Sequence, residues 1–410
     1  MFAAALLLAL APADGGVTRV RDGLVWTKAA IESGGTVRVT FLGGSITEND
    51  GFRPLVEAGL RARFPGVTWE FHNAGVASTG STTGAFRFLP DAVLAGGAWR
   101  NGNGATLVIV EAAVNDDQDE RLSAADAGWG MESIARFAEV LGPAEVAPAD
   151  LLFVHFPNEA IVAGLRAGDA PVPVAAHEQV AEHYRVPSVN VVAEVAKRID
   201  AGALTWEEYG GTHPGPAGHR LAAELIVGAV ARCVDAPAVP GYLERYGPFR
   251  PPLRADAADG TTLARPGSAD ESERASLEKL VGDGWTTGTP DWPALPGRCR
   301  ERFLEAKLLH TIEPGATLTV PPDFTALGLY VLAGPDAGAV EVAVPGEGSR
   351  VVELYHDPFS ADLHYPRTVL LYRSAEPPAG PVTVTTRAGV RGGTAVRILG
   401  VGVGFKGERP

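Results

Sequence analysis

A serine directly after a glycine pair is the first residue of this sequence that could do covalent chemistry. Ser45 follows Gly43 and Gly44, which end a run at 37–42 that alternates β-branched and apolar residues. Such a run predicts a buried strand, and a helical pattern starts soon afterwards at Phe52. A tight glycine turn between strand and helix can hold a serine hydroxyl rigidly at a sheet edge, where it can act as a nucleophile. The alternative is an ordinary loop in which Ser45 only caps the helix.

Three later stretches place further small and polar residues after predicted strands. They are a loop of small residues at 73–84, Asn115 shortly after the apolar run 106–110, and His213 within Gly-Thr-His-Pro. Serine, glycine, asparagine and histidine in this order, each just after a strand, resemble the four sequence blocks of the SGNH/GDSL hydrolase superfamily. The resemblance covers residues 17–235.

The resemblance implies a serine esterase that needs no cofactor. Ser45 would attack the ester carbonyl, His213 would take its proton, and water would then hydrolyse the acyl-enzyme. The backbone N–H of Ser45, the backbone N–H of Gly80 and the side-chain NH₂ of Asn115 would form the oxyanion hole. The loop length also allows Ser78 in place of Gly80. For Asn115 the structural alternative is a helix cap or an Asx turn.

Two positions depart from the superfamily pattern. Gly44 stands where an aspartate outside the triad usually precedes the serine, and Gly210 stands where the triad aspartate usually lies, three residues before His213. Glu207 is our candidate for the acid that orients His213 Nδ1, because the following glycines would let the chain fold back. The alternatives are Glu208, a backbone carbonyl in a Ser-His dyad, or two solvated glutamates with no catalytic role.

The elements that must position these residues alternate between strand and helix. This order predicts an α/β fold, a flavodoxin-like parallel sheet with helices on both faces. Ligands then bind at the carboxyl ends of the strands, where the four blocks fall or to which their loop returns. Apolar runs predict strands at 37–42, 68–72, 106–111, 151–155 and 188–192, and helical patterns lie at 52–64, 85–94, 131–141, 177–183, 192–200 and 218–234.

From about residue 316 the sequence changes to short alternating runs separated by Gly, Pro and Asp. This pattern predicts a β-sandwich, with strands at 317–320, 328–332, 340–344, 351–355, 368–372, 382–386 and 395–401. We therefore predict four parts: a signal peptide and the start of the mature chain at 1–16, an SGNH-like domain at 17–235, a Pro/Gly/Ala-rich linker at 236–275 and a β-sandwich domain at 276–410.

The first residues fit a secretory signal peptide. A short apolar run ends in Ala-Pro-Ala, which predicts cleavage after Ala13 and a secreted or periplasmic protein. The run is too short to span a bilayer, and no later stretch is long and apolar enough, so we expect no membrane insertion.

Composition excludes some partners. The net charge of −14 argues against nucleic acid and against an anionic membrane surface. Cys233 and Cys299 lack metal-ligand spacing, and the acidic run 116–120 lacks the spacing and glycine of an EF-hand. We therefore expect no metal.

Aromatic and polar residues gather in the second half of the β-rich region. Such a mixture can bind sugars, but it is equally suited to a sandwich edge or an interdomain contact. The residues are Tyr355, His356, Asp357, His364, Tyr365 and Arg367.

The expected function is an exported esterase that removes acyl groups, with acetyl favoured, from a small-molecule or oligosaccharide ester. The preference for carbohydrate follows from expected export, the added β-domain and family analogy. Two other functions remain open at this point: a lipid or thioester hydrolase with the same site, and a non-catalytic carbohydrate-binding protein that kept the fold.

Overall fold

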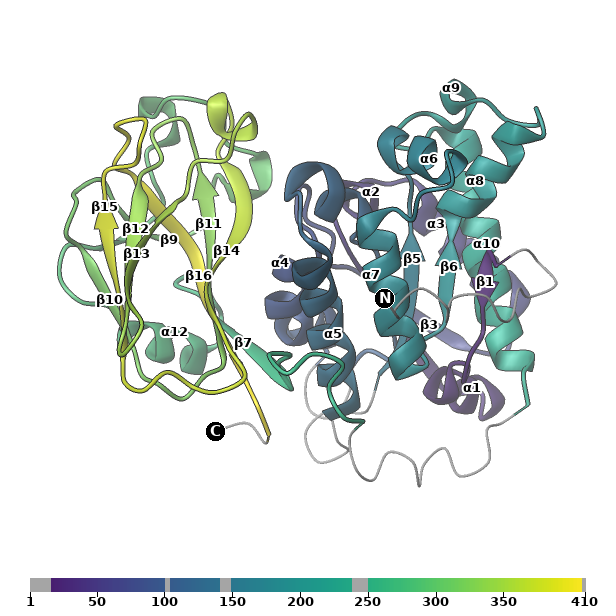
Figure 1. The fold of residues 1–410 in the computed structure, drawn as a ribbon. Coiled ribbons are helices and arrows are strands. Elements are labelled where there is room, and N and C mark those ends of the chain that lie inside the picture. The colour runs from purple at the N-terminus through teal and green to yellow at the C-terminus, as the bar shows by residue number, and fades with distance from the viewer. Residues whose placement is uncertain (1–15, 100–103, 141–148, 238–249, 408–410) are drawn as a thin grey trace, which may run out of the picture. The chain divides into compact units, whose positions relative to one another are not determined.

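The structure is a computed structural model that describes residues 16–99, 104–140, 149–237 and 250–407. These residues form two compact units, which are described separately (Figure 1). Residues 1–15 of the expected signal peptide lie outside the described residues. The α/β unit comprises the described parts of Met1–Val76, Ala92–Gly128 and Leu141–Arg250, and the β-rich unit those of Ala77–Asp91, Trp129–Val140 and Pro251–Pro410.

The α/β unit is built on a six-stranded sheet with the strand order β1-β6-β5-β4-β2-β3. All neighbours are parallel except β1 and β6. Apart from the antiparallel edge strand β1 this is the flavodoxin-like order, which confirms the predicted fold class, and the chain reverses direction across the sheet between β2 and β4. The strands are β1 (Thr18–Arg19), β2 (Thr36–Leu42), β3 (Thr68–Asn73), β4 (Leu107–Val110), β5 (Asp150–His155) and β6 (Ser188–Asn190).

Every helix predicted for the first 235 residues is present, and several begin earlier than the sequence pattern indicates. Four further short helices, α1, α2, α6 and α9, were not predicted. The α-helices are α1 (Val25–Glu32), α2 (Ser45–Glu48), α3 (Phe52–Arg63), α4 (Ser81–Arg87), α5 (Ala124–Val140), α6 (Glu159–Arg166), α7 (Val172–Tyr184), α8 (Val191–Asp200), α9 (Trp206–Tyr209) and α10 (Pro216–Asp235).

Helices cover both faces of the parallel sheet, as β5 illustrates. Successive side chains of a strand point to opposite faces. Val154 belongs to the hydrophobic core that includes Val195 of α8 and Val230 of α10. The next residue, His155, is 1% exposed and contacts Glu178 of α7 at 2.8 Å. Both faces are therefore buried, which explains why the strands read as continuous apolar runs.

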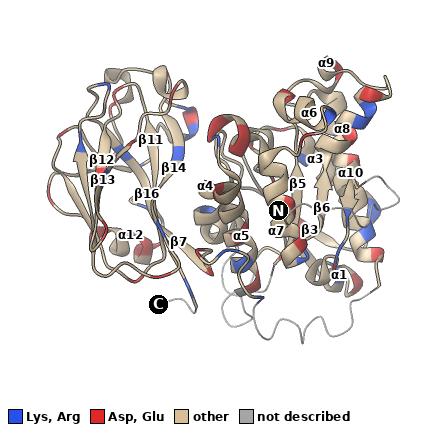
Figure 2. Cartoon of the chain, viewed as in Figure 1, with Lys and Arg blue, Asp and Glu red and all other residues tan. Residues whose placement is uncertain are grey.

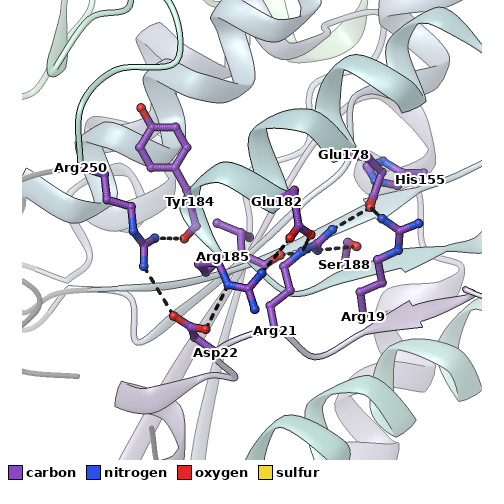
Figure 3. Close-up of polar contacts among 11 residues, drawn as sticks. Arg19, Arg21, Asp22, His155, Glu178, Glu182, Tyr184, Arg185, Ser188 and Arg250 are labelled. Carbon is purple, nitrogen blue, oxygen red and sulfur yellow. Dashed lines mark hydrogen bonds and ion pairs between the residues drawn. The ribbon is translucent and has the colours of Figure 1, made fainter. Parts of the chain in front are cut away.

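The edge strand β1 is held to its neighbours by a polar network in addition to its pairing with β6. Arg21, just after β1, donates to Ser188 Oγ of β6 at 2.9 Å and pairs with Glu178 and Glu182 at 2.8 and 3.0 Å (Figure 3). Burial alone would raise the pKa of Glu178, but the hydrogen bond from His155 and the charge of Arg21 hold that pKa well below its ordinary value. An ionised Glu178 thus connects β1, β5 and α7.

The β-rich unit contains two antiparallel sheets, which confirms the predicted β-sandwich. One sheet has the order β10-β15-β12-β13, and the other has the order β14-β11-β16-β9-β8 with β7 also paired to β16. Buried residues of both sheets, such as Val384 and Ile398, share one hydrophobic core. The strands are β7 (Gly260–Ala264), β8 (Thr286–Gly288), β9 (Leu308–Thr311), β10 (Thr317–Val320), β11 (Ala326–Ala333), β12 (Ala339–Val344), β13 (Gly348–Glu353), β14 (Tyr365–Arg373), β15 (Val382–Arg387) and β16 (Val396–Phe405).

Each of the seven predicted strands of this region is found, and β7, β8 and β9 are additional. β7 lies in the stretch expected to be a linker, as does the start of helix α12 (Glu271–Glu278). Because β7 pairs with β16 along five residues, that part of the stretch is ordered sheet.

Residues 77–91 and 129–140 pack within the β-rich unit, although they come from the first half of the chain. The Phe86 ring packs on the sheet over Gly402. A Cβ added to this glycine would lie 2.5 Å from the ring. Phe137 contacts Phe405 with ring centroids 6.3 Å apart, and Thr261 Oγ1 donates to the backbone oxygen of Ala85 at 2.6 Å. The domains predicted from the sequence, at 17–235 and 276–410, would each fold independently. These boundaries stay a prediction.

The described surface carries both signs of charge. Figure 2 shows Lys and Arg interspersed with Asp and Glu along both units. Within the described ranges, no helix combines the length and the apolar character needed to cross a membrane.

Candidate active site

Ser45 lies where the first strand of the flavodoxin-like order meets its helix. β2 ends at Leu42, the turn is Gly43-Gly44, and Ser45 is the first residue of the short helix α2. Gly44 holds the N-cap position, so the interpretation of Ser45 as a helix cap is wrong. The reversal point between β2 and β4 places Ser45 in the crevice where α/β proteins bind ligands.

Ser45 forms a hydrogen bond with His213. The Ser45 Oγ and His213 Nε2 atoms are 2.7 Å apart, although the two residues are separated by 168 positions in the chain. His213 is exposed and Ser45 is half-buried, so the pair is accessible from solvent. An imidazole nitrogen at this distance from a serine hydroxyl can accept its proton, which is the arrangement an activated nucleophile needs.

The loop that carries His213 is closed by its own backbone. It connects α9 to α10, and the Gly215 N–H donates to the Tyr209 carbonyl at 2.8 Å. Gly210 has a φ of +106°, and a Cβ at this position would stand 1.9 Å from the Gly215 nitrogen. The loop geometry therefore explains why glycine occupies the position where the superfamily that the sequence resembles has its triad aspartate.

Restoring that aspartate is expected to damage the loop. Gly210→Asp should lower both the free energy of unfolding and kcat, because the side chain requires a left-handed φ and collides with the backbone of Gly215. Urea denaturation and ester turnover measure the two effects. Gly228→Asp provides a control, since a Cβ at Gly228 meets nothing within 4 Å. An active and stable Gly210→Asp protein would contradict this account.

The acid partner of His213 remains a prediction. Glu208 accepts from the Thr205 N–H at 2.8 Å and donates its own N–H to Thr205 Oγ1 at 3.1 Å, so its carboxylate belongs to the capping box of α9. Glu207 is exposed, and the described residues offer it no hydrogen bond or ion pair. Among the same residues the His213 side chain bonds only to Ser45.

Asn115 follows β4 and is held by its side chain. It starts η3 (Asn115–Asp119), is 3% exposed, and donates through Nδ2 to Asp119 Oδ2. The N-cap of η3 is Val114, so the helix-cap interpretation of Asn115 is wrong. An amide nitrogen has two hydrogens. Asp119 accepts one and orients the group, and no other described residue accepts the second. Asp119 lies four residues after Asn115, and this spacing was the signal in the sequence that could have identified it as a partner.

Asn115 also explains the glycine before the serine. A Cβ at Gly44 would stand 1.9 Å from Asn115 Oδ1. The amide thus fills the volume that the usual aspartate side chain would need. Ser45 and Asn115, on the turns after β2 and β4, are therefore in close proximity.

Gly80 and Ser78 belong to the β-rich unit. Gly80 is the N-cap residue of α4. Ser78 has a φ of +70°, and its Oγ accepts from Arg300 at 2.6 Å. Arg300 also donates to the Ala77 carbonyl at 2.6 Å, so this loop is fixed within its own unit. The choice between Gly80 and Ser78 as oxyanion donor stays a prediction.

Several of the aromatic candidates for sugar binding pack against each other. His364 and Tyr365 are buried, and His364 contacts Trp292 with ring centroids 4.9 Å apart. The rings of His356 and Tyr365 are 5.2 Å apart, and Arg391 lies 4.3 Å above Tyr355. These contacts favour a structural role at the sandwich edge for this group.

The acidic run after Asn115 is used in hydrogen bonds. Asp116 Oδ2 lies 2.9 Å from His177 Nε2, and Asp117 accepts from Asn158 at 2.8 Å. In the part of the chain that the structure describes, no three His, Cys, Asp or Glu side chains are grouped as metal ligands. Cys233 and Cys299 are both free thiols.

Besides Asp119, sequence reasoning missed Glu111. It directly follows β4 and is 3% exposed. Its Oε1 accepts from the Gly44 N–H at 2.7 Å and from Thr47 Oγ1 at 2.9 Å. Burial, opposed by these hydrogen bonds, raises the pKa of Glu111 to about 7. The available signal was a glutamate that ends an apolar strand, since carboxylates are rarely buried without a specific role.

Glu111 makes stability depend on pH in a direction that can be measured. Its pKa rises from 4.5 in the unfolded chain to about 7 in the folded one, so the folded state keeps a proton that the unfolded state has lost. We compare the free energy of unfolding of wild type with that of Glu111→Gln. The wild-type value minus the variant value should fall by about 3 kcal/mol at most from pH 4 to pH 8. Urea denaturation measures this difference, which cancels other titrating groups. A difference that does not change with pH would contradict the assignment.

The comparisons with known proteins agree with this architecture. No protein-family model and no curated protein matches the sequence. A crystal structure of CEX, a two-domain esterase active on acetylated mannans, co-crystallised with mannopentaose, is similar with a TM-score of 0.67 and 19% identity, covering 96% of this chain and 98% of that chain. A second CEX crystal structure is similar with a TM-score of 0.66 and 18% identity, covering 96% and 100%. The chain therefore has the fold of this two-domain esterase, a flavodoxin-like α/β unit with an added β-sandwich.

Proposed function

We propose that the protein is an esterase that removes acetyl groups from a carbohydrate, with Ser45 as nucleophile and His213 as base. The observation that carries the proposal is the 2.7 Å hydrogen bond between Ser45 Oγ and His213 Nε2 at the carboxyl edge of the sheet. Similarity in fold to a mannan-active esterase over both units supports the substrate class. Acetylated mannan is therefore the first polysaccharide to test.

In the proposed mechanism His213 takes the proton of Ser45 as the hydroxyl attacks the acetyl carbonyl. The protonated imidazole then gives this proton to the sugar oxygen as it leaves. Water attacks the acetyl-enzyme with His213 again as base, and His213 returns the proton to Ser45 Oγ as acetate is released. Negative charge on the former carbonyl oxygen is stabilised by the Ser45 N–H, the Asn115 amide and the predicted donor Gly80. Because Glu207 is exposed and bonds to none of the described residues, the proposed mechanism uses Ser45 and His213 as a dyad, and Glu207 joins it only by reaching His213 in the complex with substrate.

A substrate panel tests the proposal. Purified protein is given acetylated mannan, acetylated xylan and p-nitrophenyl esters of two, four, eight and twelve carbons, and released acetate or nitrophenol is measured. We expect turnover of acetylated polysaccharide and a preference for the acetyl ester. A preference for long acyl chains would instead indicate a lipid hydrolase. Oligosaccharide binding without any turnover would indicate a non-catalytic binding protein.

Asn115→Ala is expected to lower kcat roughly 10²- to 10³-fold with little change in KM, because the amide bonds the oxyanion mainly in the transition state. Steady-state kinetics on p-nitrophenyl acetate measures this. Asn190→Ala is the matched control, since Asn190 caps α8 by accepting from the Ala193 N–H at 2.9 Å and lies on another strand. It should cost some stability and no kcat. An unchanged kcat in a folded Asn115→Ala protein would remove Asn115 from the oxyanion hole.

Export is part of the proposal, and it follows from the predicted signal peptide. Expression of the full chain in a bacterial host with a periplasm should release a mature protein that begins at Asp14, detectable by intact mass. An uncleaved chain in the cytosol would contradict it.

A further inference from the structure

The side chain of Glu111 occupies the space beneath the nucleophile turn. Its backbone N–H donates to the Leu42 carbonyl at 3.0 Å, which places it beside the end of β2. A Cβ at Gly43 would stand 2.4 Å from Glu111 Oε1 and 2.5 Å from Thr47 Oγ1. The glycine turn and the carboxyl group therefore fit each other, and a larger residue in the turn would displace the carboxyl.

Glu111 contacts the turn on both sides of Ser45. Its Oε1 accepts from the residue before Ser45, Gly44, and from Thr47, two residues after it. Thr47 is 1% exposed, so neither of these hydrogen bonds competes with bulk water. Two donors fixed on one carboxylate oxygen restrain the backbone that sets the direction of the Ser45 hydroxyl.

Tyr209 links the same carboxyl to the histidine loop. Its side chain is fully buried. Burial and, to a smaller extent, the charge of Glu111 raise the pKa of its phenol. Its carbonyl accepts from Gly215, which closes the His213 loop. Considering the described residues only, Tyr209 OH and Glu111 Oε2 are buried without a hydrogen-bond partner. Tyr209 also belongs to the hydrophobic core that contains Ile46, the residue after Ser45, and Val114, the residue before Asn115.

We propose that Glu111 is a positioning residue, which holds the Ser45 turn through Oε1, while Tyr209, in the same hydrophobic core as Ile46 of that turn, holds the start of the loop that carries His213. This inference rests on the proposed function. It concerns how Ser45 and His213 are kept at bonding distance, because Glu111 itself touches neither reacting atom. The ionised form accepts the two hydrogen bonds more strongly than the neutral form. Two further groups interact electrostatically with Glu111. The charge of Asp116 raises the pKa of Glu111, and the charge of Glu111 raises the pKa of the Tyr209 phenol.

The test compares Glu111→Gln with wild type between pH 5 and pH 9. Glutamine has the same shape and can still accept both hydrogen bonds, so the variant should fold. We expect kcat/KM on p-nitrophenyl acetate to fall roughly tenfold at pH 8 and to approach wild type near pH 5, where Glu111 is protonated as well. Labelling of Ser45 by a fluorophosphonate should slow in parallel. Circular dichroism checks the fold.

Tyr209→Phe provides a second measurement, because it removes only the hydroxyl group. We expect a several-fold lower kcat with an unchanged KM, whereas Tyr184→Phe, another buried tyrosine of this unit, should match wild type. A folded Glu111→Gln protein with the wild-type pH profile and labelling rate would overturn the proposal while leaving the esterase assignment intact. A wild-type protein with neither turnover nor Ser45 labelling would overturn both.

Discussion

Replacing Ser45 by alanine should lower kcat on acetyl esters roughly 10⁴- to 10⁶-fold, and His213→Gln should have an effect of the same size. The reason is that neither residue works without the other: the hydroxyl needs a base, and the base at 2.7 Å has no other nucleophile. Losses of such a unit are not additive. The double variant should therefore be no less active than either single one.

The measurement requires purified variants and a sensitive acetate assay. Ser33→Ala, at the exposed C-cap of α1, is the matched serine control and should retain full turnover. Residual activity of several per cent in Ser45→Ala, with the fold intact, would mean that another residue is the nucleophile. The same proteins should also be tested with a fluorophosphonate, which should label wild type and Ser33→Ala but not Ser45→Ala.

Removing residues 251–410 is expected to yield no folded protein. Phe86, Trp129 and Phe137 are each at most 2% exposed, and they pack within the β-rich unit. Trp129 Nε1 also donates to the Asp256 carbonyl at 3.0 Å. Exposing three large aromatic side chains costs on the order of 1.5–3 kcal/mol each. This sum is comparable with the whole stability of a typical domain, about 5–15 kcal/mol.

A chain that ends after Arg250 tests this expectation by soluble yield, size-exclusion chromatography and cooperative unfolding. Supplying residues 251–410 as a second polypeptide is the control, and it should restore solubility. A truncated protein that is soluble and unfolds cooperatively would instead confirm the predicted boundary of the SGNH-like domain. In that case its turnover of short esters would show whether the sandwich serves binding or stability only.

The parts of the fold that follow from local patterns were predictable from the sequence. Strands such as β2 and β4 are buried on both faces, so their apolar runs are continuous and end where the site begins. The proximity of Ser45 to His213 was expected from the family resemblance, but the position expected for His213 was wrong, because it lies in the loop between α9 and α10 and not directly after a strand. β1 could not be predicted, because two residues show no period and the strand depends on the distant partner Ser188.

Other features depend on contacts between distant residues, and these leave no local pattern. Phe86 needs glycine at position 402, more than three hundred residues away, to lie against the sheet. The role of Glu111 depends on the backbone N–H of Gly44, which every residue type except proline provides. The acid partner of His213 was open for a related reason, since the sequence does not fix how an exposed loop directs a side chain such as Glu207.

The contacts of Gly44 and Gly210 have a consequence for how such proteins are found. Both positions are those at which the superfamily usually carries aspartate, and both are closed to a side chain here, by Asn115 Oδ1 and by the Gly215 nitrogen. A sequence profile that rewards aspartate at these two alignment columns lowers the score of this chain, although its Ser45 and His213 side chains are hydrogen-bonded. A search that accepts glycine at the columns of Gly44 and Gly210, and still requires asparagine at the column of Asn115, should retrieve sequences that the usual signature discards.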